Sequence, residues 1–293
     1  MMTPWSIPGN NSSLTDVYVF PQLTYAGIFL TFSCGFHCSY CINRHGELKK
    51  RKILTASEWV CGLNRLHIDR SRMVPLTLQG GEPSVHPLWM DIIRGLRPDF
   101  YIDLLTNLDF NIDVFMKKIP PDRMKRDVPY ASIRVSYHPE YSDLDQLLNK
   151  IKRLQDAGYS IGLFMVDHPA SIVRPIAERA KEMGIDFRTK EFLGVFQDVL
   201  WGKYKYPDAL NGECKNVECR TTELLVAPNG DIHRCHRDLY AGENRVANIL
   251  DDELEIEFPF RPCSEYSRCN PCDIKVKNNR FQEFGACSVE IRP

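Results

Sequence analysis

The sequence contains little that would place this protein in a membrane, on a nucleic acid or outside the cell. No window approaches the run of about 18 apolar residues needed for a membrane span, because the apolar run 28–32 stops at Ser33. Residues 1–20 hold no basic stretch followed by an apolar core, which excludes a typical secretory signal. The 37 Lys and Arg nearly balance the 38 Asp and Glu, so no nucleic-acid partner is indicated. We therefore expect a cytoplasmic protein with neither a membrane nor a nucleic-acid partner.

Cysteine, by contrast, is abundant. The chain has 11 cysteines in 293 residues. Outside oxidising compartments, such clusters bind metals or carry out redox chemistry more often than they form disulfides. Ten of the cysteines fall into two groups, whereas Cys61 lies alone in a helical pattern and is expected to be a buried apolar residue.

Short apolar runs alternate with helical patterns from residue 27 to about residue 190, which indicates strand–helix units and a parallel sheet. The expected strands are Gly27–Phe32, Pro75–Gln79, Phe100–Leu105, Tyr130–Ser136, Ser160–Val166 and Ile185–Lys190. The expected helices are Ala56–Ile68, Leu88–Leu96, Leu144–Ala157 and Ile172–Met183, with a weaker one at Asn111–Lys118. Thr55 and Ser171 are expected to cap helix N-termini, and Gly158 and Gly184 to end helices.

Six such units can curve into an open version of the eight-stranded barrel, in which chemistry takes place at the C-terminal ends of the strands. After residue 200 the pattern changes to short strand-like pieces, Asn-Gly and Gly-Glu turns and closely spaced cysteines. We therefore expect an α/β fold, a partial (β/α)6 TIM-like barrel with a small C-terminal cysteine-rich domain. The expected divisions are an N-terminal extension at 1–26, the barrel at 27–204 and the small domain at 205–293.

The first cysteine group, Cys34-x3-Cys38-x2-Cys41, directly follows the first expected strand. Three thiolates are one fewer than a cubic iron–sulfur cluster requires. The fourth iron would then be open to the amino and carboxylate groups of a small molecule, and open coordination sites are where metals do chemistry. The alternative is a zinc site that adds His37 or His45 to the three cysteines.

This triplet, with Tyr40 before its last cysteine, resembles the signature of the radical S-adenosylmethionine superfamily over residues 27 to about 190. The resemblance implies a [4Fe-4S] cluster on the three cysteines and bound S-adenosylmethionine, which is cleaved to an adenosyl radical. Gly80-Gly81-Glu82-Pro83, at the end of the second strand, resembles the family's element that binds the methionyl amine of this cofactor. Taken alone, this tetrapeptide is an ordinary turn.

Four further residues resemble positions of the family's cofactor site. Thr106 and Asn107 follow the third strand and Ser136 ends the fourth, where the family contacts the cofactor's sugar or carboxylate. Gly162 resembles the glycine of the fifth strand, which forms a wall over the adenine. The alternatives are turn capping for the three polar residues and core packing for Gly162.

The second cysteine group begins with Cys219-x10-Gly230-x4-Cys235, which frames an expected hairpin. This spacing resembles the SPASM and twitch extensions, which hold auxiliary iron–sulfur clusters. Phe260 stands where the full SPASM pattern has a further cysteine, so seven thiolates are present where two clusters would need eight.

The resemblance implies auxiliary clusters held by the cysteines of this second group. We favour two such clusters, each with its own set of ligands. The nearer cluster would be held by Cys214, Cys219, Cys235 and Cys272, and the more distant one by Cys263, Cys269 and Cys287. A single auxiliary cluster with spare structural cysteines is one alternative, and a structural zinc module is another.

The resemblance also implies a function. We expect a radical enzyme that acts on a small polar substrate, such as a sugar or aminocyclitol alcohol, since little sequence precedes Cys34. His236, directly after Cys235, is the candidate catalytic base, because imidazole near neutral pH suits a proton acceptor. Substrate contacts are expected from Tyr137, His138 and His168. An external low-potential electron donor, similar to flavodoxin or ferredoxin, would supply electrons.

Two other functions remain open at this point. One is a SPASM maturase that modifies a peptide or protein by side-chain oxidation or crosslinking. The other is a non-catalytic iron–sulfur or zinc binding module, which would explain the cysteines but not the Gly80–Pro83 element or the strand–helix repeat.

Overall fold

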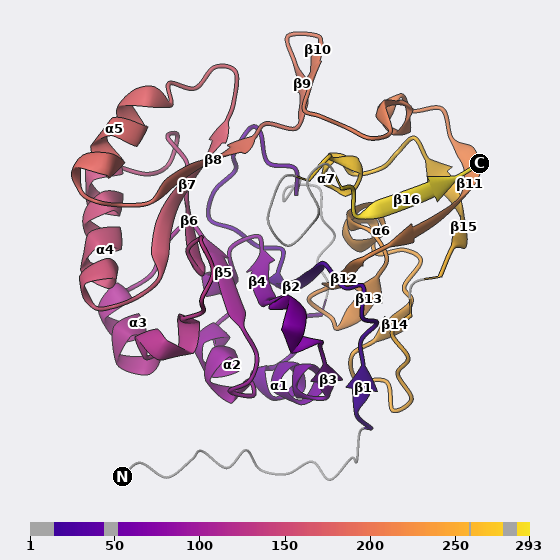
Figure 1. Cartoon of the computed structure of the whole chain (residues 1–293), viewed down its shortest axis with the longest axis horizontal. Helices are drawn as coiled ribbons and strands as arrows, with labels where there is room; N and C mark the ends of the chain where they lie inside the picture. Colours follow the sequence, from indigo (N-terminus) through magenta and orange to yellow (C-terminus); the bar gives the residue numbers. More distant parts are fainter. Residues whose placement is uncertain (1–14, 44–51, 258, 278–285) are drawn as a thin grey trace.

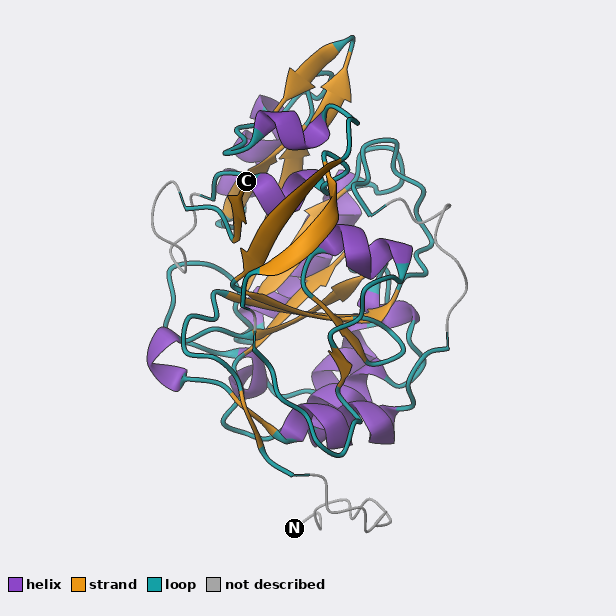
Figure 2. Ribbon diagram, turned by 90° about the vertical axis from the view of Figure 1, so that its right-hand side faces the viewer, coloured by secondary structure: helices purple, strands orange, loops and turns teal. Residues whose placement is uncertain are grey.

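A curved nine-stranded sheet with helices packed on its outer face forms most of the molecule (Figure 1). The computed structural model describes residues 15–43, 52–257, 259–277 and 286–293. A smaller three-stranded sheet lies to one side of the large one, and the views in Figures 1 and 2 show it beside the C-terminal helices.

The elements begin and end as follows. The strands are β1 Val17–Tyr18, β2 Tyr25–Thr31, β3 Leu66–His67, β4 Leu76–Gly80, β5 Ile102–Thr106, β6 Ile133–Tyr137, β7 Ile161–Asp167, β8 Phe187–Glu191, β9 Gly194–Phe196, β10 Val199–Trp201, β11 Lys215–Thr221, β12 Glu223–Val226, β13 Asp231–His233, β14 Ala247–Asn248, β15 Arg261–Tyr266 and β16 Val289–Arg292. The α-helices are α1 Ala56–Asn64, α2 Trp89–Gly95, α3 Ile112–Lys118, α4 Leu144–Asp156, α5 Arg174–Glu182, α6 His236–Ala241 and α7 Pro271–Ile274. Short 3-10 helices occupy Arg70–Arg72, Pro83–Val85, Pro121–Met124 and Pro207–Leu210.

The large sheet has the strand order β14-β13-β12-β2-β4-β5-β6-β7-β8. All neighbours from β12 to β8 are parallel, whereas β13 and β14 pair antiparallel. The six predicted strands of the strand–helix repeat are therefore confirmed as β2, β4, β5, β6, β7 and β8. Their carboxyl ends lie at one edge of the sheet, as in barrels whose chemistry is placed there.

The C-terminal third of the chain contributes to both sheets. The predicted hairpin is present as β12 and β13, and β12 pairs with β2, so it extends the large sheet. The smaller sheet, in the order β15-β11-β16, carries Cys219 and Cys263. The division at residue 204 stays a proposal, because the two halves of the chain share one sheet.

Alternation along the strands gives the large sheet two different faces. In β6, for example, Ile133 and Val135 pack into the core beneath the helices, whereas Arg134 and Ser136 point the opposite way. We call this second side, away from helices α1–α5, the inner face. It carries polar and charged side chains that the strand pattern places inside the curve of the sheet.

Helix boundaries follow local chemistry. Thr55 forms the predicted cap of α1, accepting from the Glu58 amide at 3.2 Å while the Glu58 carboxylate accepts from the Thr55 amide at 2.7 Å. Gly158 and Gly184 have φ of +92° and +68°, which suits the ends of α4 and α5. Ser171 was wrong as a cap, because α5 begins at Arg174 with a proline in its first turn.

Two other predictions about the first helix were wrong. The helix ends at Asn64 instead of Ile68, because Leu66–His67 forms β3 and pairs with Val17–Tyr18 of β1. Cys61 is exposed, since α1 turns Trp59 and Leu63 toward the core and Cys61 toward solvent. Among the described residues, no helix is long and apolar enough to cross a membrane.

Two glycines allow β4 to end against the chain that leaves β2. A Cβ on Gly80 would lie 2.0 Å from the carbonyl oxygen of Thr31, and one on Gly81 would lie 2.1 Å from that of Ser33. Real Cβ contacts are not this short, and Gly80 also has a φ of +139°. The pair is therefore required by close backbone approach.

We expect Gly81→Ala to lower the free energy of unfolding by more than about 2 kcal/mol, because its methyl group would collide with rigid backbone. Gly35→Ala is the matched control, since nothing lies within 4 Å of a Cβ at that position. Urea unfolding of both variants measures the difference. Equal stability of the two would show that the turn relaxes without cost.

Candidate functional site

The three cysteines of the first group lie on one loop directly after β2. The Cys41 amide donates to the Cys38 carbonyl at 3.1 Å, and the Phe36 amide donates to the Cys34 sulfur at 3.4 Å. Burial, together with the neighbouring thiols, raises the pKa of Cys38 to about 12, and burial also raises the pKa of Cys34. Half-buried thiols that repel each other's negative charge become thiolates readily when a metal shares that charge.

His138 connects this loop to the end of β6. Its Nδ1 lies 3.3 Å from the Cys38 sulfur and 2.9 Å from the Tyr40 hydroxyl, and its ring stacks on Tyr40. Burial lowers the pKa of His138 to about 4, so the imidazole is neutral. Tyr137, by contrast, points to the opposite side and packs into the core beneath the helices. His168 lies next to Tyr40, with ring centroids 5.7 Å apart.

The Gly80–Pro83 element lies against the start of the cysteine loop. The Gly81 amide donates to the Thr31 carbonyl and the Glu82 amide to the Ser33 carbonyl, both at 2.8 Å. Glu82 is buried, and burial raises its pKa. This position follows from the tight turn, which directs the side chain toward the end of β5.

Thr106 and Asn107 bind Glu82. The Thr106 hydroxyl and the Asn107 amide each donate to the carboxylate at 2.7 Å, and the Ser84 amide donates at 3.1 Å. The Thr106 hydroxyl also accepts a hydrogen bond from the Leu108 amide at 2.9 Å, which stabilises the turn after β5. This network holds the ends of β4 and β5 together at the edge where the cysteine loop lies.

The remaining two cofactor candidates occupy different levels of the sheet. Ser136 is half-buried on the inner face, two residues before His138 and near the carboxyl end of β6. Gly162 is the second residue of β7, and a Cβ there would meet the Asp186 carbonyl oxygen at 2.9 Å. The structure does not bring Gly162 to the cysteine loop, because it lies at the opposite end of its strand.

A hydrogen-bonded chain from α6 reaches the same place. The Asn43 side-chain amide donates to the Gly80 carbonyl at 2.9 Å, and the Tyr240 hydroxyl donates to the Asn43 side-chain oxygen. Tyr240 packs edge-on against Phe29, with ring centroids 6.0 Å apart. No pattern in the sequence predicts this contact, because Asn43 and Tyr240 are almost 200 positions apart.

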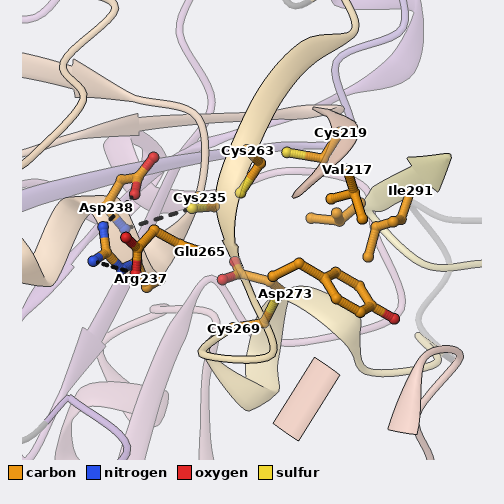
Figure 3. A pocket seen from close by; sticks show the side chains of 12 residues that line it. Val217, Cys219, Cys235, Arg237, Asp238, Cys263, Glu265, Cys269, Asp273 and Ile291 are labelled. Atoms are coloured by element: carbon orange, nitrogen blue, oxygen red, sulfur yellow. Dashed lines mark hydrogen bonds and ion pairs between the residues drawn. The ribbon is translucent and has the colours of Figure 1, made fainter. Parts of the chain in front are cut away.

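Four cysteines of the second group line one pocket, which Figure 3 shows from close by. They are Cys219 on β11, Cys263 on β15, Cys235 at the start of α6 and Cys269 before α7. Val217, Tyr266, Val289 and Ile291 supply apolar walls. We call this the four-cysteine pocket.

The electrostatics of the four-cysteine pocket suit thiolate ligands of a metal. The Cys219 thiol donates to Cys263, which raises the pKa of Cys219 and lowers that of Cys263 to about 6. Burial raises the pKa of Cys235 and raises that of Cys269 to about 12. The Asp238 amide points at the Cys235 sulfur at 3.5 Å. Four sulfurs around one pocket are the ligand set of a tetrahedral zinc or a cubic iron–sulfur cluster.

The other three cysteines of this group lie elsewhere, which differs from the division that the resemblance implied. Cys214 is exposed. The Lys277 ammonium lies 3.6 Å from the Cys272 sulfur, and the Cys287 thiol donates to the Asp273 carbonyl at 3.1 Å. The sequence order of cysteines could not reveal this grouping, because the β11–β15 pairing decides it.

His236 is buried beside two carboxylates. Its Nδ1 lies 2.7 Å from Asp273 and 3.7 Å from Glu223. Burial alone would lower its pKa, but Asp273 and the other anions outweigh burial and raise it to about 9. His236 therefore carries a proton at neutral pH in this structure, and its role as a catalytic base stays a prediction. The sequence missed Glu223 and Asp273, although Asp273 directly follows a cysteine.

The sequence offered His37 or His45 as the fourth ligand of a zinc site in the first group. His37 is exposed, and His45 lies outside the described residues.

The sequence did not single out Lys190, which is the last residue of a predicted strand. Its ammonium points to the inner face of the sheet.

Comparison with known proteins adds to this geometry. No protein-family model matches the chain. Among curated proteins, GTP 3',8-cyclase of Agrobacterium fabrum is 32% identical over 87 residues, which are 30% of this chain and 24% of the cyclase. The chain thus spans about a quarter of the length of this curated relative.

Solved structures share the fold at low identity. SuiB of Streptococcus suis, bound to the precursor peptide SuiA, aligns with a TM-score of 0.52 and 14% identity over 80% of this chain and 64% of SuiB. The enzyme anSMEcpe with bound AdoMet aligns with a TM-score of 0.50 and 13% identity over 78% of each chain. At this level of identity, these structures show that the chain shares their fold.

Proposed function

We propose that this protein is an enzyme that reductively cleaves S-adenosylmethionine to a 5′-deoxyadenosyl radical and takes hydrogen from a small polar substrate, such as a sugar or aminocyclitol alcohol. One observation carries the proposal. Cys34, Cys38 and Cys41 lie on a loop whose start is hydrogen bonded to the Gly80–Pro83 turn.

The residues present fit a [4Fe-4S] cluster at this loop. Three soft thiolates are suitable iron ligands, and the Phe36 amide donates to one of the sulfurs. The cluster, when bound, would supply a single electron to the cofactor's sulfonium. Tyr40 and His138 hold the loop against the end of β6, which fixes where the thiolates point.

The Gly80–Pro83 turn and the end of β5 would form the floor of the cofactor site. Gly81 is the partly exposed member of the turn, whereas Glu82 is held by Thr106 and Asn107. Because Glu82 is already positioned by these donors, its carboxylate would meet a cofactor ammonium without reorganising. Ser136 on the inner face is the next polar group available to the cofactor.

We further propose that the four-cysteine pocket holds an auxiliary [4Fe-4S] cluster of the SPASM or twitch type. Cys219, Cys235, Cys263 and Cys269 complete its ligand set, so no outside ligand is needed. Such a cluster, when bound, would supply an acceptor for the electron that a substrate radical loses when it becomes the oxidised product. Asp273 lines this pocket and lies 2.7 Å from His236, so this buried pair is the candidate that would take up a substrate proton.

A peptide or protein substrate is the second candidate. SuiB, which has this fold, was solved with a precursor peptide. In this chain the β9–β10 hairpin projects from the molecule and exposes Val195, Val199, Leu200 and Trp201, which offers apolar contacts to a peptide (Figure 1). Release of 5′-deoxyadenosine with candidate alcohols, compared with candidate peptides, separates the two. Turnover with peptides alone would end the small-molecule proposal.

The proposed cluster site predicts that replacing Cys38 abolishes activity, whereas replacing Cys61 does not. After anaerobic reconstitution and reduction with dithionite, we expect the wild type to form 5′-deoxyadenosine and Cys38→Ala to lose at least about a hundredfold in rate, because a ligand of the reactive iron is gone. Cys61→Ala, exposed on α1, is the control and should retain wild-type activity. Activity in Cys38→Ala would contradict the assignment of the site.

The four-cysteine pocket predicts the iron content of the protein. We expect about eight irons and eight labile sulfides per chain in the wild type, four for each cubic cluster, and about four in Cys263→Ser. Cys214→Ser should resemble the wild type, because Cys214 is exposed and outside the pocket. Zinc without labile sulfide would instead favour a structural zinc module, and loss of iron in Cys214→Ser would restore the division implied by the sequence.

A further inference from the structure

Lys190 is a cation with no anionic partner among the described residues. It is the fourth residue of β8, and alternation places it on the inner face, where its ammonium lies 5.7 Å from the centre of the Phe164 ring. No hydrogen bond or ion pair joins this ammonium to another described residue. The Lys190 side chain is half-buried, and a partly desolvated charge without an anionic partner is costly, so its presence needs a reason.

Asp103, whose charge acts on Lys190, and Glu191, its neighbour in the sequence, already bind other cations. Asp103, fully buried on β5, binds both Arg126 and Arg134, the latter at 2.9 Å. Glu191 binds the Lys275 ammonium at 3.1 Å. Lys190 therefore adds a positive charge to a region where two guanidiniums already share one carboxylate.

The titration of Lys190 agrees with this geometry. Burial, and then the charge of Arg134, lower the pKa of Lys190 to about 8 from its ordinary 10.5. The Cys272 thiol and Asp103 act in the opposite direction, and Lys275 acts in the same direction as Arg134. At neutral pH the side chain is still mostly an ammonium, so the region is positive.

Lys190 also lies close to the proposed cofactor site. Its charge contributes to the low pKa of His138, which contacts the Cys38 sulfur and Tyr40. On the other side it lies within electrostatic range of Cys272, next to the four-cysteine pocket. The charge of Lys190 therefore acts on groups at the cysteine loop and next to the four-cysteine pocket.

We propose that Lys190 is a specificity-determining residue, and that the substrate carries a carboxylate or phosphate group that docks on its ammonium at the inner face of the sheet. The inference rests on the proposed function and narrows it. It favours an anionic sugar derivative, or an acidic side chain of a peptide, over a cationic aminocyclitol, because like charges repel in a site of low dielectric.

If the Lys190 charge is uncompensated, it should lower the stability of the folded protein. Lys190→Met should be more stable than the wild type at pH 7, because it removes an ammonium that the folded state disfavours. A lowered pKa means that the penalty is complete below about pH 8 and disappears when the lysine is neutral in both folded and unfolded states, above about pH 10.5. Thermal unfolding from pH 7 to 10.5 should show the gap closing. A gap independent of pH would contradict the premise.

Anion binding is tested directly with sodium sulfate and with sodium succinate as probes, titrated by calorimetry into the reconstituted protein at constant ionic strength. We expect Lys190→Gln to bind at least about tenfold more weakly than the wild type, and Lys190→Arg to stay within about threefold of it, since it keeps the charge. Lys181→Gln, exposed on α5, is the control and should bind as the wild type. Equal affinity of wild type and Lys190→Gln would overturn the proposal.

The carboxylate of S-adenosylmethionine is a second anion that Lys190 could bind, and equilibrium dialysis with the labelled cofactor separates the two sources. We expect Lys190→Gln to bind the cofactor as tightly as the wild type, because the proposal assigns its ammonium to the substrate, and cleavage of the cofactor is measured separately in the wild type with dithionite. Loss of cofactor binding in Lys190→Gln would assign Lys190 to the cofactor and overturn the substrate assignment. Failure of the wild type to cleave the cofactor would instead refute the proposed function, and leave the sulfate result to decide on the anion site.

Discussion

The close approach of the Gly80–Gly81 backbone to the chain leaving β2 determines the geometry of the site. Two backbone amides of this turn bind carbonyls of Thr31 and Ser33, immediately before the first cysteine. Any side chain at Gly80 or Gly81 would push the two segments apart. The cysteine loop and the end of β4 thus form one rigid unit, and Glu82 fastens this unit to the end of β5. A cofactor binds more tightly to a site whose side chains are already ordered, because binding then loses less conformational entropy.

Charge is distributed unevenly around this unit. The cysteine loop lies beside a neutral His138, whereas His236 is an imidazolium held between Glu223 and Asp273. The same type of side chain therefore has opposite protonation at two sites, because burial outweighs the charge of Glu140 at His138, whereas Asp273 and Glu223 outweigh burial at His236. Lys190 has no anionic partner in an ion pair among the described residues.

The C-terminal third is joined to the strand–helix repeat through secondary structure as well as side chains. Strand β12 pairs with β2, and Tyr240 on α6 reaches the Gly80 carbonyl through Asn43. The four-cysteine pocket begins at the same helix, with Cys235 at its start. The four-cysteine pocket and the cysteine loop are therefore connected through α6, although they lie far apart in the sequence.

The sequence by itself determined the local features. Apolar alternation gave the six parallel strands, Thr55 with Glu58 gave the start of α1, and the spacing of Cys34, Cys38 and Cys41 gave the loop after β2, since each depends on neighbours a few residues away. Only the tertiary structure decided the burial of Glu82, the exposure of Cys61 and the isolation of Lys190. It also decided which four cysteines share a pocket, because the pairing of β11 with β15 sets Cys263 beside Cys219. These properties depend on strand pairing and on the sum of charges from distant segments, which no local pattern encodes.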